Sequence, residues 1–316
     1  MTLAPDDLTI RPITGPEELE LFRRLPYVLD EELAGDLAGG RRRPGWLWVA
    51  LRGDRLLARA AWWGQAGAKT PFLLDVFDLD DDDPGPGPVA AGERLLRAAL
   101  AEVVPAGAVP PEYLRFVPPD WRDSAPDRLA VERRLAVIGR TGARPLVERL
   151  RLEWRPGTPL PPPSGRLAFR PMNGDGELLA LMTRVLDGTL DAHSRADLTR
   201  MPAADAARKH FEQELAHLRS PREWWRIATL PDGEPVGFVT PGHNDYNAVI
   251  GYLAVLPSHR GHGYIDDILA EGTRLLAAQD VPRIRAATDV GNVPMAAAFH
   301  RAGYVTFERV VSLTWD

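Results

Sequence analysis

Apolar residues in the second half of the chain follow two spacings. Short runs of alternating or continuous apolar positions predict strands, and longer runs with apolar residues three and four positions apart predict helices. The predicted elements are a strand at 167–171, helices at 177–186 and 202–218, strands at 224–230, 236–240 and 247–255, a helix at 265–279, a strand at 283–288, a helix at 294–302 and a strand at 305–315. This order predicts a mixed α/β sheet with helices on both faces.

The two halves of the chain begin and end alike. LTIRPITGPEEL, which starts at Leu8, resembles LAFRPMNGDGEL, which starts at Leu167. The first half ends in GARPLVERLRLEW and the second in GYVTFERVVSLTW, each with a glycine twelve residues before a closing Leu-x-Trp. Matched ends in matched order predict the duplication of one domain. The proline-rich segment 155–166 is expected to be an extended linker between domains at 1–154 and 167–316.

Composition excludes several classes of function. The net charge of -6 argues against a nucleic-acid-binding protein, which needs a basic surface. Cysteine is absent, so disulfides, thiolate metal sites and cysteine nucleophiles are excluded. The start MTLAPDDLTI has no signal-peptide pattern, and no stretch is long and apolar enough for a membrane span. We expect a cytoplasmic protein, monomeric or homodimeric.

The stretch LPSHRGHGYIDDIL, which starts at Leu256, combines a glycine-rich loop with the start of a helix. Helix N-termini have unsatisfied N–H groups and a partial positive charge, and glycines let an anion approach the backbone closely. Residues 260–264 supply consecutive amide donors there, so the loop predicts an oxyanion site. It is not the dinucleotide fingerprint, because Asp266 stands three residues after Gly263, and it lacks the Gly-Lys-Ser/Thr of nucleotide phosphate loops.

Read as Val-x-Pro-x-x-Arg-Gly-x-Gly, the run VLPSHRGHG at 255–263 resembles the acyl-CoA loop of the GNAT N-acetyltransferases. The resemblance continues through Asn292, Met295, Phe299, Gly303 and Tyr304, which match the spacing of the family's second motif. It implies two tandem GNAT-like domains, each a mixed, largely antiparallel central sheet flanked by helices, in a layout similar to that of mycothiol synthase. The implied cofactor is acetyl-CoA or another acyl-CoA, contacted by Leu253, Val255, Arg260, Gly261, His262, Gly263, Tyr264, Asn292, Met295 and Phe299.

Two positions depart from the family pattern. Ile265 stands where the family prefers Gly or Ala, and Phe299 stands where a tyrosine usually protonates the leaving CoA thiolate. Phenylalanine has no proton to donate, and a general acid typically contributes about 10²–10⁴-fold to the rate. Because a thiolate is a tolerable leaving group, water or another residue could supply the proton.

The first half keeps the outline of the glycine loop and lacks its chemistry. When Gly85 is aligned with Gly261, the flanking residues are Pro84 and Pro86, which have no N–H. The neighbouring aspartates, Asp78 and 80–83, are expected to repel a pyrophosphate. The first domain is therefore predicted to be GNAT-like and to bind no CoA.

The residues that would move protons are less clearly marked. In the family the base is usually a glutamate on or beside the strand before the loop, but 247–255 contains neither an acid nor a histidine. Candidates are Asp289, Tyr252, and His243 with Asp245. Asp289 could equally cap a helix, His243 and Asp245 could form a plain hairpin turn, and Tyr252 could point into the core or the cleft.

Contacts to the acceptor substrate in the family come largely from the segment between the first two helices, here 187–201. Asp187, Asp191 and His193 are candidates to receive a cationic amine. The alternative is that these are solvated loop residues, with Ser194 and Asp197 in a capping arrangement. His210 and His217 share a predicted helix without a third ligand nearby, so no metal site is predicted.

Together these features predict an N-acetyltransferase that transfers acetyl directly from acetyl-CoA to a primary amine of a small molecule, with no covalent enzyme intermediate. Two alternatives are a non-catalytic acyl-CoA-binding or sensor protein and an interaction scaffold. Neither nucleic acid nor membrane is an expected partner.

Overall fold

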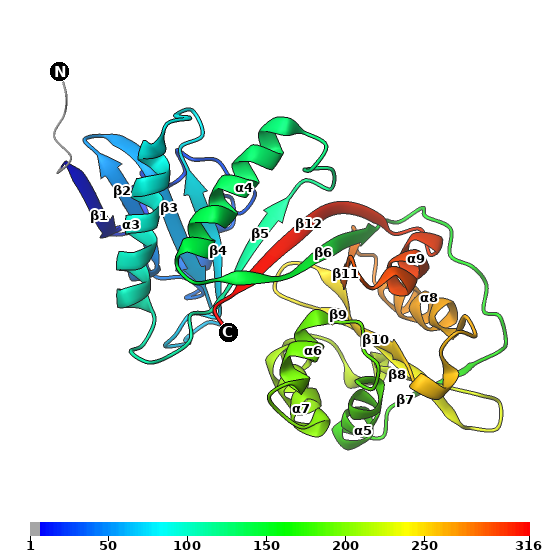
Figure 1. Ribbon diagram of the computed structural model, residues 1–316. Helices are drawn as coiled ribbons and strands as arrows, with labels where there is room; N and C mark the ends of the chain where they lie inside the picture. The colour runs from blue at the N-terminus through cyan, green and yellow to red at the C-terminus, as the bar shows by residue number, and fades with distance from the viewer. Residues whose placement is uncertain (1–6) are drawn as a thin grey trace. The chain divides into compact units, whose positions relative to one another are not determined.

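The computed structural model describes residues 7–316, which divide into two compact units (Figure 1). The first unit contains the chain up to Val147 together with Val310–Asp316, and the second contains Glu148–Arg309. Residues 1–6, part of the start interpreted above as lacking a signal peptide, lie outside the described residues. In the described part of the chain, no helix has the length and apolar character to cross a membrane.

The first unit is built around five strands in the order β1-β2-β3-β4-β5, with β12 as the next neighbour of β5. Only the β4–β5 pair within this set is parallel. Its elements are β1 (Leu8–Pro12), α1 (Leu19–Phe22), α2 (Leu33–Ala38), β2 (Leu47–Arg52), β3 (Arg55–Trp63), β4 (Leu73–Leu79), α3 (Pro86–Val103), β5 (Glu112–Val117) and α4 (Ala125–Arg140).

The second unit has the strand order β6-β11-β10-β9-β8-β7. Helices α8 and α9 cover one face of this sheet, and α5, α6 and α7 cover the other (Figure 1). Its elements are β6 (Arg144–Trp154), β7 (Ala168–Pro171), α5 (Asp175–Val185), α6 (Ala192–Leu198), α7 (Ala203–Gln213), β8 (Arg226–Thr229), β9 (Pro235–His243), β10 (Ala248–Val255), α8 (Tyr264–Ala277), β11 (Ile284–Asp289), α9 (Val293–Arg301) and β12 (Val305–Thr314).

The last strand of each sequence half contributes to the structural unit formed mainly by the other half. β6 ends the first half of the sequence, yet it pairs antiparallel with β11 from Arg149 to Trp154. β12 ends the second half, yet its residues from Val310 belong to the first unit. The division therefore falls at Val147 and Val310, inside these two strands, and not at the proline-rich segment 155–166.

The duplication read from the two sequence starts is repeated in local structure. In the first half, Arg11 donates to Glu18 at 2.6 Å, and in the second half Arg170 donates to Glu177 at 2.5 Å. The same glutamates accept the amides of Thr14 and Asn173, each at 2.7 Å. The two starts thus share one ion-pair motif that joins the first strand to the turn after it.

A β-bulge at Gly251 decides which way the side chains of β10 point. The pairing of β10 with β9 shifts between Ile250 and Tyr252, so one residue of β10 has no partner. Ile250 and Leu253 consequently pack beside α8, whereas Tyr252 packs on the face covered by α5 and α7. The alternation of side chains between the two faces of a strand could not assign Tyr252 to a face from the sequence, because the bulge shifts that alternation by one residue.

One helix was missed in the sequence. Residues 192–198 lie in the segment predicted to be an inter-helix loop, but they form α6. The long helix predicted at 202–218 is shorter, since α7 ends at Gln213 and a 3-10 turn follows at Leu215–His217. The other predicted elements of the second half are present, with ends shifted by a few residues.

Candidate active site

The parallel neighbours β10 and β11 separate along most of their length. Ala248 and Val249 pair with Ile284 and Arg285, and no further pairing of these two strands occurs in the described structure. Both strands keep their outer partners, because β10 stays paired with β9 to Val255 and β11 stays paired with β6. The inner edges of 250–255 and 286–289 therefore lack a strand partner, which is the arrangement that an extended ligand arm can occupy.

The loop after β10 exposes a row of backbone donors. A 3-10 turn at Pro257–His259 leads into the loop, and α8 starts at Tyr264 with Gly263 as its N-cap. Within the described residues, the five amides of 261–265 have no hydrogen-bond acceptor. Gly261 and Gly263 have φ values of 83° and 73°, in the left-handed region that favours glycine. The loop can therefore present several N–H groups to one anion at a helix N-terminus.

Arg260 connects this loop to helix α5. Its guanidinium donates to the carbonyl oxygens of Val185 at 2.8 Å and Asp187 at 2.7 Å, at the end of α5. Arginine satisfies terminal helix carbonyls in this way. Among the predicted cofactor residues, Arg260 thus has a side chain committed to holding α5.

A second arginine, not identified in the sequence, secures the other side of the loop. Arg166 donates to the carbonyl oxygens of His262 at 3.0 Å and Gly263 at 3.3 Å, and it pairs with Asp267 at 2.5 Å. Because Arg166 bonds the carbonyl oxygens of the loop, the loop amides remain available to a ligand. Arg166 had been assigned to the linker, and only its tertiary contacts reveal this role.

The second motif of the sequence has structural roles. Asn292 is the N-cap of α9, and its side chain accepts from the amide of Met295 at 3.4 Å. Phe299 is 1% exposed and packs against the ring of Tyr304 at 5.1 Å. The Tyr304 hydroxyl is itself hydrogen-bonded to Thr273, 2.8 Å away. Neither aromatic ring presents an available proton donor.

Asp289 joins β11 to the helix that the sequence did not predict. The Asp289 carboxylate accepts from the amide of Ala192 at 2.7 Å and lies 3.1 Å from Arg149. Asp191 is the N-cap of α6, and it accepts from the amide of Ser194 at 2.7 Å. Asp191, and not Ser194, therefore provides the cap at this helix. Burial and the nearby Asp191 raise the pKa of Asp289.

The structure brings four of the predicted site residues to one region of the second unit. Asp289 bonds the start of α6, where Asp191 and His193 lie, and Asp191 also raises the pKa of Tyr252, although burial is the larger cause of that rise. Tyr252 lies within the separated part of β10. The carboxylates and the tyrosine thus lie on the separated parts of the two strands and beside them, and Arg149 is the basic group paired with the two carboxylates.

His243 lies away from this region. It is the last residue of β9, opposite Ala248, whereas the glycine loop follows the other end of the strand pair, where Gly237 lies opposite Val255. At about 3.3 Å per residue, the seven steps from Ala248 to Val255 span roughly 23 Å. Asp245 in the adjoining turn pairs with Arg219. The structure therefore places His243 away from the glycine loop, at the end of β10 that is still paired with β11.

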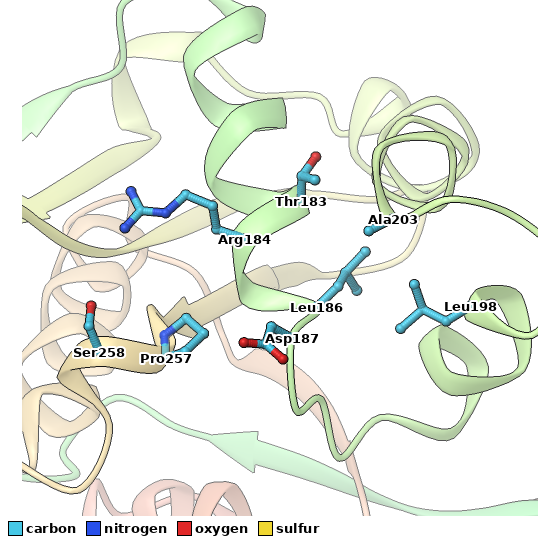
Figure 2. A pocket seen from close by; sticks show the side chains of 8 residues that line it. All are labelled: Thr183, Arg184, Leu186, Asp187, Leu198, Ala203, Pro257 and Ser258. Atoms are coloured by element: carbon cyan, nitrogen blue, oxygen red, sulfur yellow. The ribbon is translucent and has the colours of Figure 1, made fainter.

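Asp187 lines a separate pocket of about 470 Å³ beside the glycine loop. Figure 2 shows its eight lining side chains, which come from α5, α6, α7 and the turns that follow α5 and β10. The lining combines one carboxylate and one guanidinium with apolar side chains, and its members are Thr183, Arg184, Leu186, Asp187, Leu198, Ala203, Pro257 and Ser258. A volume of this size suits a small molecule.

The corresponding region of the first unit is closed by its own side chains. β4 and β5 also separate after two paired residues. Between them, Arg115 donates to the Phe77 carbonyl oxygen at 3.1 Å and to the fully buried Asp78 at 2.7 Å. Arg134 and Arg59 approach the same carboxylate. The arginines therefore offset the repulsion of a pyrophosphate that was expected from Asp78. The gap between β4 and β5 is filled by these side chains.

The loop of the first unit offers few donors. α3 begins at Pro86 with Gly85 as its N-cap, and Pro88 follows within the first turn. The Gly85 amide donates to Asp83 at 2.9 Å. This differs from the second unit, where consecutive amides have no acceptor in the described chain.

Comparisons with known proteins agree with this geometry. Residues 190–304 match the model of the Acetyltransferase (GNAT) family. No curated protein sequence matches the chain. Among solved structures, a GCN5-related N-acetyltransferase from Sphaerobacter thermophilus is similar with a TM-score of 0.60 at 18% identity, covering 99% of this chain and 96% of its own.

A tandem GNAT protein from the clavulanic acid biosynthesis pathway is similar with a TM-score of 0.52 at 16% identity, covering 97% of this chain and 98% of its own. At these identities the two likenesses establish the fold, which extends over both halves of the chain. The segment that matches the family model contains α6, the glycine loop and α9. Residues 190–304 therefore match the GNAT acetyltransferase family, and the chain as a whole has the fold of the GNAT proteins to which it is similar.

Proposed function

We propose that the second unit binds acetyl-CoA and transfers its acetyl group directly to a primary amine of a small molecule in a ternary complex. The observation that carries this proposal is the combination of separated parallel strands with a run of unbonded amides at the N-terminus of α8. Such a terminus suits an anionic group, and the open strand edges suit an amide-containing arm. When bound, acetyl-CoA would supply the acetyl thioester.

The residues present fit this cofactor. The amides of 261–265 would hold the pyrophosphate, with Arg166 and Arg260 fixing the loop from behind. Leu253 and Val255 lie on the separated part of β10, where backbone groups would contact the arm and the thioester carbonyl. Asn292 and Met295 would shape the far wall through the start of α9.

The acceptor amine would approach from the side of α6. Asp191, His193 and Asp289 lie there, and their hydrogen bonds to the backbone of α6 fix the carboxylates in place. A cationic amine would be attracted by these carboxylates and must lose a proton before it attacks. The pocket with Asp187 lies beside the loop and could hold a further part of the acceptor.

A second candidate function, a non-catalytic acyl-CoA binder, is favoured by two observations. Phe299 is buried at the position of the usual proton donor, and Asp289 is engaged by Ala192 and Arg149. Both functions require the glycine loop. They differ in that only the transferase releases CoA thiol when an amine is added.

Thiol release from acetyl-CoA with a panel of small primary amines tests the proposal. We expect amine-dependent release that is lost in Gly261→Asp, whose carboxylate would repel the anion. Gly261→Asn is the matched control, because Asn and Asp both tolerate the left-handed conformation and differ in charge. Binding of acetyl-CoA without release for any amine would favour the binder, and equal loss in both variants would contradict the anion role of the loop.

A further inference from the structure

His210 on α7 has an unexplained nitrogen beside the site. Its Nε2 is buried and has no hydrogen-bond partner among the described residues. Buried polar atoms without a partner are rare, and each requires a structural or functional reason. The residue lies on the face of the sheet covered by α5 and α7, the same face as Tyr252.

The side chains of His210 and Tyr252 are in contact. Their ring centroids are 4.8 Å apart with an angle of 53° between the planes, and the Phe238 ring also packs on Tyr252 at 5.2 Å. The Tyr252 hydroxyl likewise has no hydrogen-bond partner in the described structure, since the bonds of this residue are made by its backbone. The two rings are thus side by side, but the hydroxyl and Nε2 are not hydrogen-bonded to each other, so a proton that passes between them needs a bridging water.

We propose that Tyr252 and His210 form the proton relay of the transfer reaction, an inference that rests on the proposed function. The amine nitrogen bonds to the acetyl carbon and the carbon–sulfur bond breaks, with its electron pair leaving on sulfur. One proton of the attacking nitrogen passes to the Tyr252 oxygen as the hydroxyl proton passes through one bridging water to His210 Nε2. Sulfur takes a proton from water, and His210 later returns its proton to solvent. Tyr252 touches the amine, and His210 acts through Tyr252.

The surroundings keep His210 ready to accept a proton at neutral pH. Burial lowers its pKa below the ordinary value, which leaves the imidazole neutral. Asp191 and Asp197 on α6 oppose this lowering, whereas Arg149 on β6 and His193 on α6 add to it. On Tyr252, burial and Asp191 raise the pKa and Arg260 lowers it, so the hydroxyl keeps its proton until a relay moves it.

The relay is tested with His210→Gln, Tyr252→Phe and the double variant in the full-length chain. We expect each single variant to lose about 10²–10⁴-fold in amine-dependent thiol release at pH 7.5. The double variant should lose no more than either single one, because two members of one relay are not additive. The wild-type rate should fall as pH drops through a pKa below 6.5, and this acid limb should disappear in His210→Gln. His217→Gln, at an exposed histidine, is the control and should change neither.

A readout without cofactor accompanies the kinetics. Histidine NMR should show an imidazole whose pKa lies below the ordinary value, and its signal should be absent in His210→Gln and shifted in Tyr252→Phe. Full activity or a retained acid limb in His210→Gln would overturn the relay, as would losses that multiply in the double variant.

Calorimetry with acetyl-CoA separates the two proposals. Binding by wild type without turnover of any amine overturns the relay and leaves the cofactor site, whereas no binding removes both.

Discussion

Gly251 lies at a position where the chain has no room for a side chain. A Cβ added there would lie 2.6 Å from Leu218 and 2.9 Å from the carbonyl oxygen of Thr240, which is backbone and cannot rotate away. The constraint is local crowding at the bulge of β10. Because the bulge sets the direction of Tyr252, this glycine links sheet geometry to the proposed chemistry.

Gly251→Ala should therefore lower the free energy of unfolding by about 1–3 kcal/mol, the usual cost of overpacking. Thermal unfolding measures the change. Gly176→Ala is the matched control, since nothing lies within 4 Å of a Cβ there and the residue is in α5. That variant should be neutral or gain roughly 0.5–1 kcal/mol from helix propensity. An unchanged unfolding temperature in Gly251→Ala would contradict the crowding.

Single residues show what the sequence could and could not predict about the site. Gly261 and Gly263 were identifiable because a glycine-rich turn before a helix is a local pattern. His210 was considered only as a metal ligand, since its burial and its contact with Tyr252 depend on a strand far away in the sequence. Asp289 and Asp191 were recognised as candidates, but their shared connection through α6 depends on a hydrogen bond that spans 97 residues.

At the scale of elements, the two units use the same strand separation in opposite ways. In the second unit the separation of β10 and β11 leaves strand edges without partners. In the first unit the separation of β4 and β5 contains Asp78, which interacts with three arginines. Burial alone would raise the pKa of Asp78, but Arg115, Arg59 and Arg134 outweigh it and lower the pKa to about 2.

Asp78→Asn should destabilise the protein by about 3–5 kcal/mol at neutral pH, because it leaves buried guanidinium groups without their carboxylate. The lowered pKa means that Asp78 contributes stability above its unfolded value, near 3.8, and that this contribution is lost as pH falls toward about 2. Chemical unfolding between pH 2 and 7 should thus show the two proteins converging in acid. Asp82→Asn, on the exposed loop, should stay within about 0.5 kcal/mol of wild type. A constant difference at all pH values would contradict the assignment.

Elements with strong local patterns were predictable, and the others failed for identifiable reasons. α8 has a glycine start and a broad apolar face, and the pattern predicts it nearly to the residue. α6 has seven residues with mostly polar side chains, and its start is held by Asp289. Nothing in the seven letters AHSRADL distinguishes such a helix from a loop.

At the scale of the whole molecule, the exchange of closing strands changes where the chain can be divided. The repeated sequence ends predict a domain boundary at 155–166, but β6 lies before that segment and supplies the neighbour of β11. The similar ends of the two halves indicate that one domain was duplicated. Which strands then pair depends on contacts that no local sequence pattern specifies. The duplication could therefore be predicted from the sequence, whereas the exchange of the closing strands β6 and β12 could not.

A fragment that starts at residue 167 should be much less stable than one that starts at residue 148. The shorter fragment lacks β6. The six β11 residues Ile284–Asp289 therefore lose their pairing partners on β6. Circular dichroism and thermal unfolding of both fragments, each ending at residue 316, measure the difference. Equal stability would mean that β6 is dispensable to the second unit.

The stoichiometry of acetyl-CoA binding, measured by calorimetric titration into the full-length protein, tests the central claim most directly. The second unit has an open strand gap and free loop amides, whereas side chains fill the strand gap of the first unit. This predicts one site per chain, lost in Gly261→Asp and kept in Asp78→Asn under conditions where that variant is folded. Two sites per chain would contradict the closed first unit. No binding would contradict the proposed acetyl-CoA site altogether.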